Sequence, residues 1–257
     1  MKICMASMRC SGRLAWNHAP LIALALLAIP CTDAVASDFF GPSEGLQIQP
    51  ELDVFERLND DFRLIQRFLP TFIPSQGYSE LGFGAYIGWF VAPLTTKTIS
   101  PDFARRRRLD VRLGVEWYPS LVEGTAPASN FLLIDLEGTP RLVIPGEILF
   151  TLRYRMEARW QLAEPSSFAW RLRFRPQLER EFDLSDTVSL TPFANAEWIW
   201  STTNGMWDQF RMQVGLQLGF YWFGAGQVIE LNGSVFTYLQ PSRSHSPVLG
   251  VVFYQFF

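Results

Sequence analysis

The densest set of side chains that could do chemistry in this 257-residue chain is a series of arginines and glutamates between residues 153 and 181. They occupy alternate positions, separated by apolar residues such as Tyr154 and Phe174. Together with two charges further along the chain, the set comprises Arg153, Arg155, Glu157, Arg159, Arg171, Arg173, Arg175, Glu179, Glu181, Glu197 and Arg211. Guanidinium groups bind carboxylates and other oxyanions in planar, bidentate geometry. These residues therefore either brace one another or line a path for small anions.

The spacing of these charges predicts β-strands, because successive side chains of a strand point to opposite faces. The alternation runs through residues 147–160 and 168–182. Strands of soluble sheets usually have about 5–6 residues, whereas a transmembrane β-strand needs about 9–11 and alternates apolar with polar residues. We therefore predict a hairpin of a transmembrane barrel, with the apolar face toward lipid and the charges toward the lumen. An edge hairpin of a soluble β-sandwich is the alternative.

The charges also restrict how the two strands of this hairpin pair. One register places Glu157 opposite Arg175 and Arg153 opposite Glu179. The neighbouring register would place Arg155 opposite Arg175, where like charges repel each other. We therefore predict the first register.

Similar alternation recurs along the chain after residue 36, without a helix-period segment or a linker. The further segments are 46–57, 62–72, 78–91, 109–117, 131–138, 187–200, 209–222, 227–239 and 248–257. The pattern predicts an all-β fold, a single antiparallel transmembrane β-barrel. It gives eleven strands, but bacterial single-chain barrels have even numbers. We therefore expect twelve strands, with ten as the alternative, and regard 131–146 and 46–57 as the doubtful regions.

The N-terminus has the pattern of an export signal. Basic residues precede an apolar run at 19–29 that is too short to span a bilayer as a helix. Ala34-Val35-Ala36 supplies the small-x-small pattern after which signal peptidase cleaves. We predict a signal peptide at 1–36 and an outer-membrane β-barrel domain at 37–257. Lipoprotein processing at Cys31 is disfavoured by the proline before it.

Composition limits the other functions that the chain could have. Its formal net charge of −3 gives no reason to expect nucleic-acid binding. All three cysteines lie within the predicted signal peptide, and His245 is the only histidine outside it. A metal site needs a cluster of ligands, so we predict no metal and no cofactor.

His245 is also the only candidate catalytic base. Outer-membrane phospholipases and lipid A deacylases activate a serine with a histidine that reaches it by hydrogen bond. His245 lies between Ser244 and Ser246 in a predicted outer loop, and the His-x-Ser-Asn type of motif is absent. We therefore predict that the protein is not an enzyme.

Two further features carry expectations about the lumen and its ends. Gly82, Gly84 and Gly88 share one face of a predicted strand, which indicates a crowded interior. The longest break, 94–108, ends in four consecutive arginines that either contact solvent or bind an anion or a lipid headgroup. If the C-terminus is periplasmic, strand order places this break on the periplasmic side, where turns are normally short.

Residues 154–160, 170–175 and 190–193, together with Glu197, resemble the bacterial family called domain of unknown function 2490. The resemblance implies an outer-membrane β-barrel without an established activity, and it names no site residues. The expected partners are outer-membrane lipid and the barrel-assembly machinery, which would read the C-terminal strand ending at Phe257.

Three functions remain open at this point. The first is a structural or interaction barrel with an Arg/Glu-lined lumen in the bacterial outer membrane. The second is a narrow channel for small anionic solutes or acidic oligosaccharides, since rings of arginine select anions in pores. The third is a lipid-acting outer-membrane enzyme.

Overall fold

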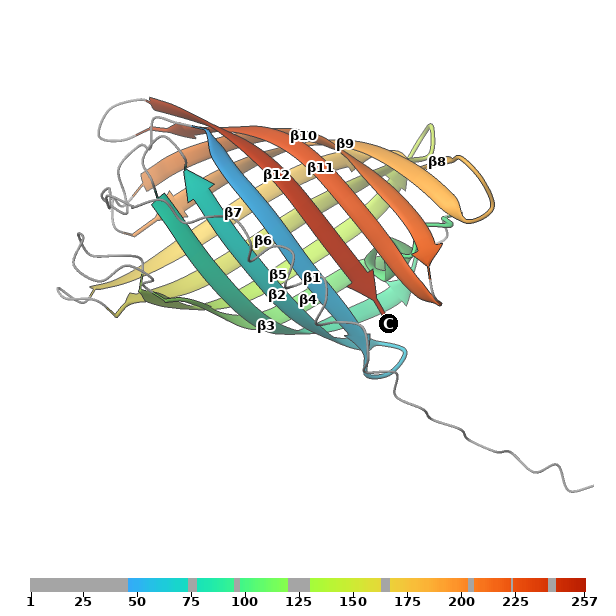
Figure 1. Cartoon of the computed structure of the whole chain (residues 1–257), viewed down its shortest axis with the longest axis horizontal. Coiled ribbons are helices and arrows are strands. Elements are labelled where there is room, and N and C mark those ends of the chain that lie inside the picture. The colour runs from blue at the N-terminus through green and yellow to red at the C-terminus, as the bar shows by residue number, and fades with distance from the viewer. Residues whose placement is uncertain are drawn as a thin grey trace, which may run out of the picture. The chain divides into compact units, whose positions relative to one another are not determined.

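The computed structural model of the chain describes residues 46–73, 78–94, 98–119, 130–162, 167–202, 206–222, 224–239 and 244–257. By its internal contacts the chain divides into two units, 1–32 and 33–257, and all of the described residues belong to the second. This unit is a closed all-β barrel (Figure 1). The predicted signal peptide lies outside the described residues.

Each segment that alternates in the sequence forms a strand. The strands are β1 (Gln47–Arg57), β2 (Phe62–Ile73), β3 (Tyr78–Pro93), β4 (Arg107–Tyr118), β5 (Phe131–Ile144), β6 (Ile148–Gln161), β7 (Ser167–Glu179), β8 (Phe182–Asp183), β9 (Val188–Ser201), β10 (Met206–Trp222), β11 (Ala225–Tyr238) and β12 (Ser244–Phe256). The described residues also form one short 3₁₀ helix, η2 (Phe103–Arg106). None of the helical structure in these residues is long and apolar enough to cross a membrane.

Eleven of the described strands close the ring. Neighbours along the chain pair antiparallel, except that β1 and β12 pair in parallel, from Gln47 opposite Val248 to Phe55 opposite Phe256. An odd number of up-and-down strands brings the first and the last together in the same direction, so the parallel seam follows from the count. The expectations of twelve or ten strands and of a wholly antiparallel sheet are therefore wrong. Both doubtful regions are strands, β1 and β5.

The two-residue strand β8 is not counted in the ring, but it continues the line of β7. Glu179 of β7 lies opposite Phe193, and Phe182 of β8 lies opposite Leu190. Both pairs belong to the same register on β9. The strand is interrupted at residues 180–181, where the Glu181 side chain binds residues 98–100.

The barrel has a charged interior and an apolar exterior. Glu197 and Asp135 are 0% exposed, whereas Val214 and Leu113 are 64% and 53% exposed. Exposed tryptophans lie near both ends of the strands, Trp117, Trp170 and Trp207 at one end and Trp222 at the other. A small apolar core of Phe55, Ile65 and Tyr86 fills part of the interior. The predicted assignment of charges to the inner face and apolar side chains to the outer face is confirmed.

The glycines of β3 and β4 make room for large inward side chains. A Cβ atom at Gly114 would lie 2.0 Å from the Tyr86 ring, and one at Gly82 would lie 2.5 Å from the Tyr118 ring. Real Cβ atoms do not approach other atoms so closely, so both positions require glycine. The prediction of a crowded interior behind this strand is confirmed.

The parallel seam can be tested by disulfide formation, because every native cysteine lies before residue 32. Leu52 lies directly opposite Phe253 across the seam. We expect Leu52→Cys with Phe253→Cys to form a disulfide on mild oxidation, since paired positions in a sheet suit disulfide geometry. Mass spectrometry of the tryptic peptides measures the crosslink.

The matched control is Leu52→Cys with Leu249→Cys. Leu249 is level with Ile48, four residues from Leu52, so the two thiols would be about 13 Å apart along the strands. Crosslinking of the control pair in preference to the first pair would contradict the seam.

Candidate functional site

The β6–β7 hairpin pairs in a register that the sequence did not predict. Arg153 lies opposite Arg175 instead of Glu179, and Arg155 lies opposite Arg173. The predicted register is wrong, and so is the neighbouring one that was considered beside it. Arginine faces arginine twice, although like charges directly opposite each other are destabilising.

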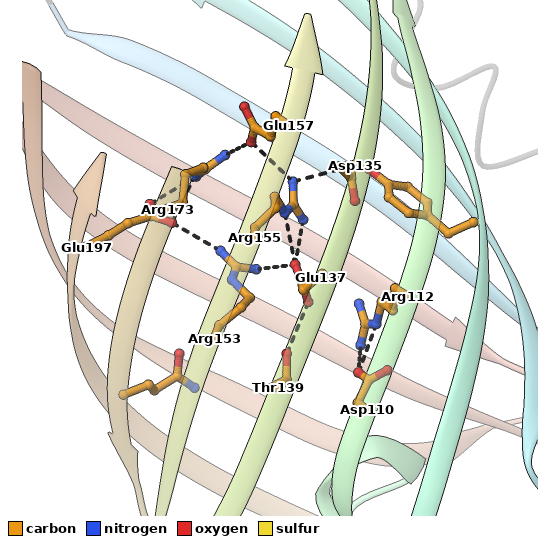
Figure 2. A network of polar contacts seen from close by, with 12 residues as sticks. Asp110, Arg112, Asp135, Glu137, Thr139, Arg153, Arg155, Glu157, Arg173 and Glu197 are labelled. Atoms are coloured by element: carbon orange, nitrogen blue, oxygen red, sulfur yellow. Dashed lines mark hydrogen bonds and ion pairs between the residues drawn. The ribbon is translucent and has the colours of Figure 1, made fainter. Parts of the chain in front are cut away.

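Acidic residues on the flanking strands explain why this register is tolerated. Arg155 donates from Nε to Glu137 Oε2 on β5 (2.9 Å), and its Nη2 lies 2.8 Å from the same oxygen. Arg173 binds Glu197 of β9 in bidentate fashion, through Nε (3.1 Å) and Nη2 (2.9 Å). Its Nη1 also donates to Glu157 (2.9 Å). Figure 2 shows this network, which joins β5, β6, β7 and β9.

Arg153 lies at the centre of this network and makes longer contacts than Arg155 and Arg173 do. Its guanidinium lies between two carboxylates, 3.6 Å from Glu137 and 3.5 Å from Glu197. Both carboxylates are nearly inaccessible, and each makes closer bonds to another arginine. Arg153 therefore shares acceptors that are already occupied.

A second ion-pair cluster, which was not predicted from the sequence, lies on strands β1, β2 and β4. Arg67 of β2 contacts Glu51 (2.8 Å), Asp53 (3.0 Å) and Glu116 (3.1 Å). Its Nη1 also donates to the Tyr86 hydroxyl at 3.1 Å. One guanidinium thus holds carboxylates from β1 and β4.

Further acidic residues that were not predicted lie on β4 and β5. Asp110 pairs with Arg112 (2.6 Å), and Asp135 and Glu137 are buried beside Arg155. All of them lie at alternate positions of predicted strands, so their inward direction could have been inferred from the same periodicity.

The eleven charges predicted to line the lumen are buried or half-buried, but they do not form one ladder. Arg159 lies 3.9 Å from Glu157 and 4.6 Å from the centre of the Phe131 ring, and Arg171 donates to Gln209 (2.8 Å). Arg211 donates to Ser234 Oγ (3.0 Å). Glu179 and Glu181 bind a segment outside the hairpin, described next.

Residues 98–106, between β3 and β4, cross the lumen at one end of the barrel; we call them the plug segment. Arg105 at the end of η2 is 5% exposed, and its Nε lies 3.1 Å from Glu179 Oε1. It also donates to Thr191 Oγ1 (2.7 Å) on β9 and to Gln217 on β10. Burial lowers the pKa of this guanidinium, but the carboxylates of Glu179, Asp102 and Glu181 outweigh it and raise the pKa above its ordinary value.

Glu181 fixes the start of the plug segment. Its carboxylate accepts from the backbone N–H groups of Ile99 (3.0 Å) and Ser100 (2.8 Å), and from the Thr98 hydroxyl. These contacts account for the interruption between β7 and β8, because Glu181 is used to hold the plug segment.

The remaining plug contacts reach strands on other sides of the ring. Phe103 lies under the guanidinium groups of Arg63 (4.0 Å) and Arg107 (4.5 Å), and its ring meets Phe90 edge-on at 5.3 Å. Pro101 lies so close to Gly226 that a Cβ there would be 2.3 Å away. The segment thus contacts strands β2, β3, β7, β9, β10 and β11.

Most described residues of the break at 94–108 lie inside the end of the barrel, where they contact its wall. Of the four consecutive arginines, Arg105 is buried and paired with carboxylates, whereas Arg106 and Arg108 are exposed. Neither expectation for this run, solvent contact or anion binding, describes Arg105.

An internal cavity of about 310 Å³ lies within the lumen. Among the described residues that line it, eight are arginines and four are glutamates: Arg67, Arg153, Arg155, Arg159, Arg171, Arg173, Arg175, Arg211, Glu51, Glu116, Glu157 and Glu230. The cavity wall is therefore positive, although much of that charge is paired.

His245 is the second residue of strand β12 and does not lie in an outer loop as predicted. Its side chain is exposed, and its Nδ1 lies 3.1 Å from Thr237 Oγ1. The neighbouring Ser246 is 0% exposed and accepts a hydrogen bond from Gln47 (3.0 Å). Within the described parts of the chain, no group of three or more His, Cys, Asp or Glu is placed to hold a metal ion.

Comparison of the chain with protein-family models, with characterised proteins and with solved structures gives no significant match. The resemblance to the domain of unknown function 2490 family therefore stays a prediction.

The network can be tested by removing one of its buried acceptors. Glu197→Gln removes the bidentate carboxylate of Arg173 and one of the two carboxylates beside Arg153. Removing one partner of a buried ion pair costs about 3–5 kcal/mol. We expect the free energy of unfolding to fall by that amount, measured by urea titration with tryptophan fluorescence. Glu147→Gln, in the exposed turn between β5 and β6, is the control and should change it by less than about 0.5 kcal/mol. Equal effects of the two substitutions would show that the network does not stabilise the fold.

Proposed function

We propose that the protein is an outer-membrane β-barrel with a structural or interaction role, whose lumen is closed to free diffusion. The observation that carries the membrane placement is the exposed apolar exterior around a charged interior. Large exposed apolar patches on soluble monomers rarely exceed a few hundred Å². Here such residues occur on the outward faces of strands all around the ring, including Ile87, Leu113, Met156, Leu172, Val214, Leu231 and Leu249.

The plug segment and the ion pairs support the closed lumen. Arg105 and Glu181 connect the segment to the barrel wall at one end. Arg153, Arg155 and Arg173 extend into the lumen further along and bind carboxylates on other strands. A solute would have to displace the plug segment at that end and separate these charges within the lumen.

The assembly route forms part of the proposal. Phe257 follows the last strand directly, and its backbone N–H donates to the Phe55 carbonyl (2.9 Å) at the seam. We propose that the barrel-assembly machinery reads this strand, and that outer-membrane lipid covers the apolar exterior.

Membrane placement predicts an unusual response to an arginine on the outer surface. Val214 lies in the middle of β10 and is 64% exposed. If lipid covers it, Val214→Arg should destabilise the barrel by about 2–4 kcal/mol, as at a bilayer midplane. In a water-soluble barrel the same surface substitution would change stability by less than about 0.5 kcal/mol. The measurement is reversible unfolding of the barrel in lipid vesicles.

The control for this experiment is Leu184→Arg. Leu184 is 59% exposed but lies in the turn after β8, beyond the strands. Its substitution should be nearly neutral in the same vesicles. A neutral result at Val214 as well would argue against the membrane.

The second candidate function, a narrow channel for small anionic solutes, is favoured by the arginine-rich cavity. Planar bilayers separate it from the closed barrel. We expect the wild-type protein to give no step conductance, and Arg105→Ala to give a measurable ion leak because the plug segment loses its anchor to Glu179 and Thr191. Arg108→Ala, at an exposed position near the plug, should behave as wild type. Anion-selective steps from the wild-type barrel would replace the closed-barrel proposal with the channel.

A further inference from the structure

One row of inward side chains crosses four neighbouring strands beside the cavity. Arg153 on β6 lies opposite Arg175 on β7, and Glu197 on β9 lies opposite Arg211 on β10. The register of β7 with β9 pairs Phe174 with Trp198 and Gln177 with Asn195, which makes Arg175 level with Glu197. The row therefore holds three arginines and one glutamate, and all three arginines line the cavity.

The single glutamate does not neutralise these arginines. Both Glu197 oxygens bind Arg173 of the next row, and its contact with Arg153 is longer, at 3.5 Å. Arg175 makes no hydrogen bond or ion pair with any described residue, and its Nε is buried. Arg211 donates to Ser234, and its guanidinium lies 4.6 Å from the centre of the Phe236 ring. Positive charge thus accumulates on one wall of the cavity.

Such an arrangement is unfavourable in the absence of a counter-charge. Like charges directly opposite each other on neighbouring strands repel, and a buried charge without a partner is expensive. Guanidinium groups form short, bidentate hydrogen bonds with oxyanions. An anion in contact with all three arginines would supply the acceptor that Arg175 lacks among the described residues. It would also add to the long contacts of Arg153 with Glu137 and Glu197 and to the single hydrogen bond of Arg211.

The next row along the same strands adds neutral polar groups. Gln177, Asn195 and Gln213 lie side by side on β7, β9 and β10, and all three line the cavity. Asn195 Nδ2 donates to Gln213 Oε1 (3.0 Å) and to Gln177 Oε1 (3.4 Å). Amide groups beside a cationic row suit a ligand with several oxygens, some charged and some neutral.

The size of the cavity limits that ligand. Its 310 Å³ corresponds to roughly ten water molecules at about 30 Å³ each. The cavity therefore accommodates an ion of the size of phosphate with its waters, or one small organic acid.

We propose that the lumen contains a binding site for a small oxyanion, formed by Arg153, Arg175 and Arg211 with the amides of Gln177, Asn195 and Gln213. The site goes beyond the closed barrel proposed above. It requires neither conduction nor a membrane partner, and it depends only on the interior of the barrel.

The test uses the full-length barrel purified in detergent at neutral pH. Its thermal unfolding is followed by tryptophan fluorescence in sodium phosphate and in sodium chloride of equal ionic strength, and phosphate affinity is measured by calorimetry. We expect phosphate to raise the Tm in a saturable manner, because a ligand that binds only the folded state stabilises it. Sulfate should act similarly, whereas acetate, with one charge, should act more weakly.

Arg175→Gln is the decisive variant. We expect phosphate affinity to fall by about tenfold or more, since each 1.4 kcal/mol of lost interaction is tenfold. We also expect the Tm in chloride to rise, because the substitution removes a half-buried charge that has no partner among the described residues. This opposite sign separates a ligand-binding arginine from a merely structural one, whose loss would lower the Tm in both salts.

Arg141→Gln is the matched control, because Arg141 is an inward arginine of β5 that does not line the cavity and pairs with Asp110 (3.6 Å). Its phosphate affinity should stay within about twofold of wild type. Arg211→Gln serves as the second variant if Arg175→Gln fails to fold, with the same expected loss of affinity. Equal Tm shifts in phosphate and chloride, or unchanged phosphate affinity in both the Arg175 and the Arg211 variant, would overturn the proposal.

Discussion

Charge burial inside a closed ring is the constraint on which the rest of this structure depends. A guanidinium that points into the lumen cannot turn away from its neighbours, so its acceptors must come from whichever strands lie within reach. Glu137 and Glu197, on either side of the arginine-rich hairpin, meet that need for Arg155 and Arg173. Charge balance is therefore achieved across four strands and not within the hairpin.

The same constraint explains why a loop fills one end of the barrel. Glu179 and Glu181 point inward near the rim, where the arginines of the hairpin do not reach them. The plug segment supplies Arg105 and two backbone N–H groups to these carboxylates. The other turns at this end of the barrel are short. This connection is longer because it extends into the lumen and binds the wall there.

The sequence predicted the strands and the direction of their side chains well, because a period of two is a local signal. Residues such as Glu157 and Leu172 could be assigned to a face without knowledge of their neighbours. The register of the hairpin could not be predicted in this way, since it depends on carboxylates of β5 and β9 that are distant in the sequence. The strand count failed for a different reason. The sequence showed eleven alternating segments, but the general rule that bacterial barrels have even strand numbers led to an expectation of twelve. The plug segment has no periodic pattern, so nothing local indicated where Arg105 would lie.

The parallel seam has a consequence for the order of folding. Gln47 and Ser246, which meet there, are separated by 199 residues, whereas the other strand pairs in the ring join neighbours in the chain order. Contacts between distant residues form slowly, because the entropy of closing a long loop is lost before they stabilise anything. The sheet can grow by successive hairpins from either end of the chain, but its circumference closes only when the last strand is available. Until then β1 and β12 are open edges, and those edges are where another strand, from a partner or from a second copy, would compete with the native closure.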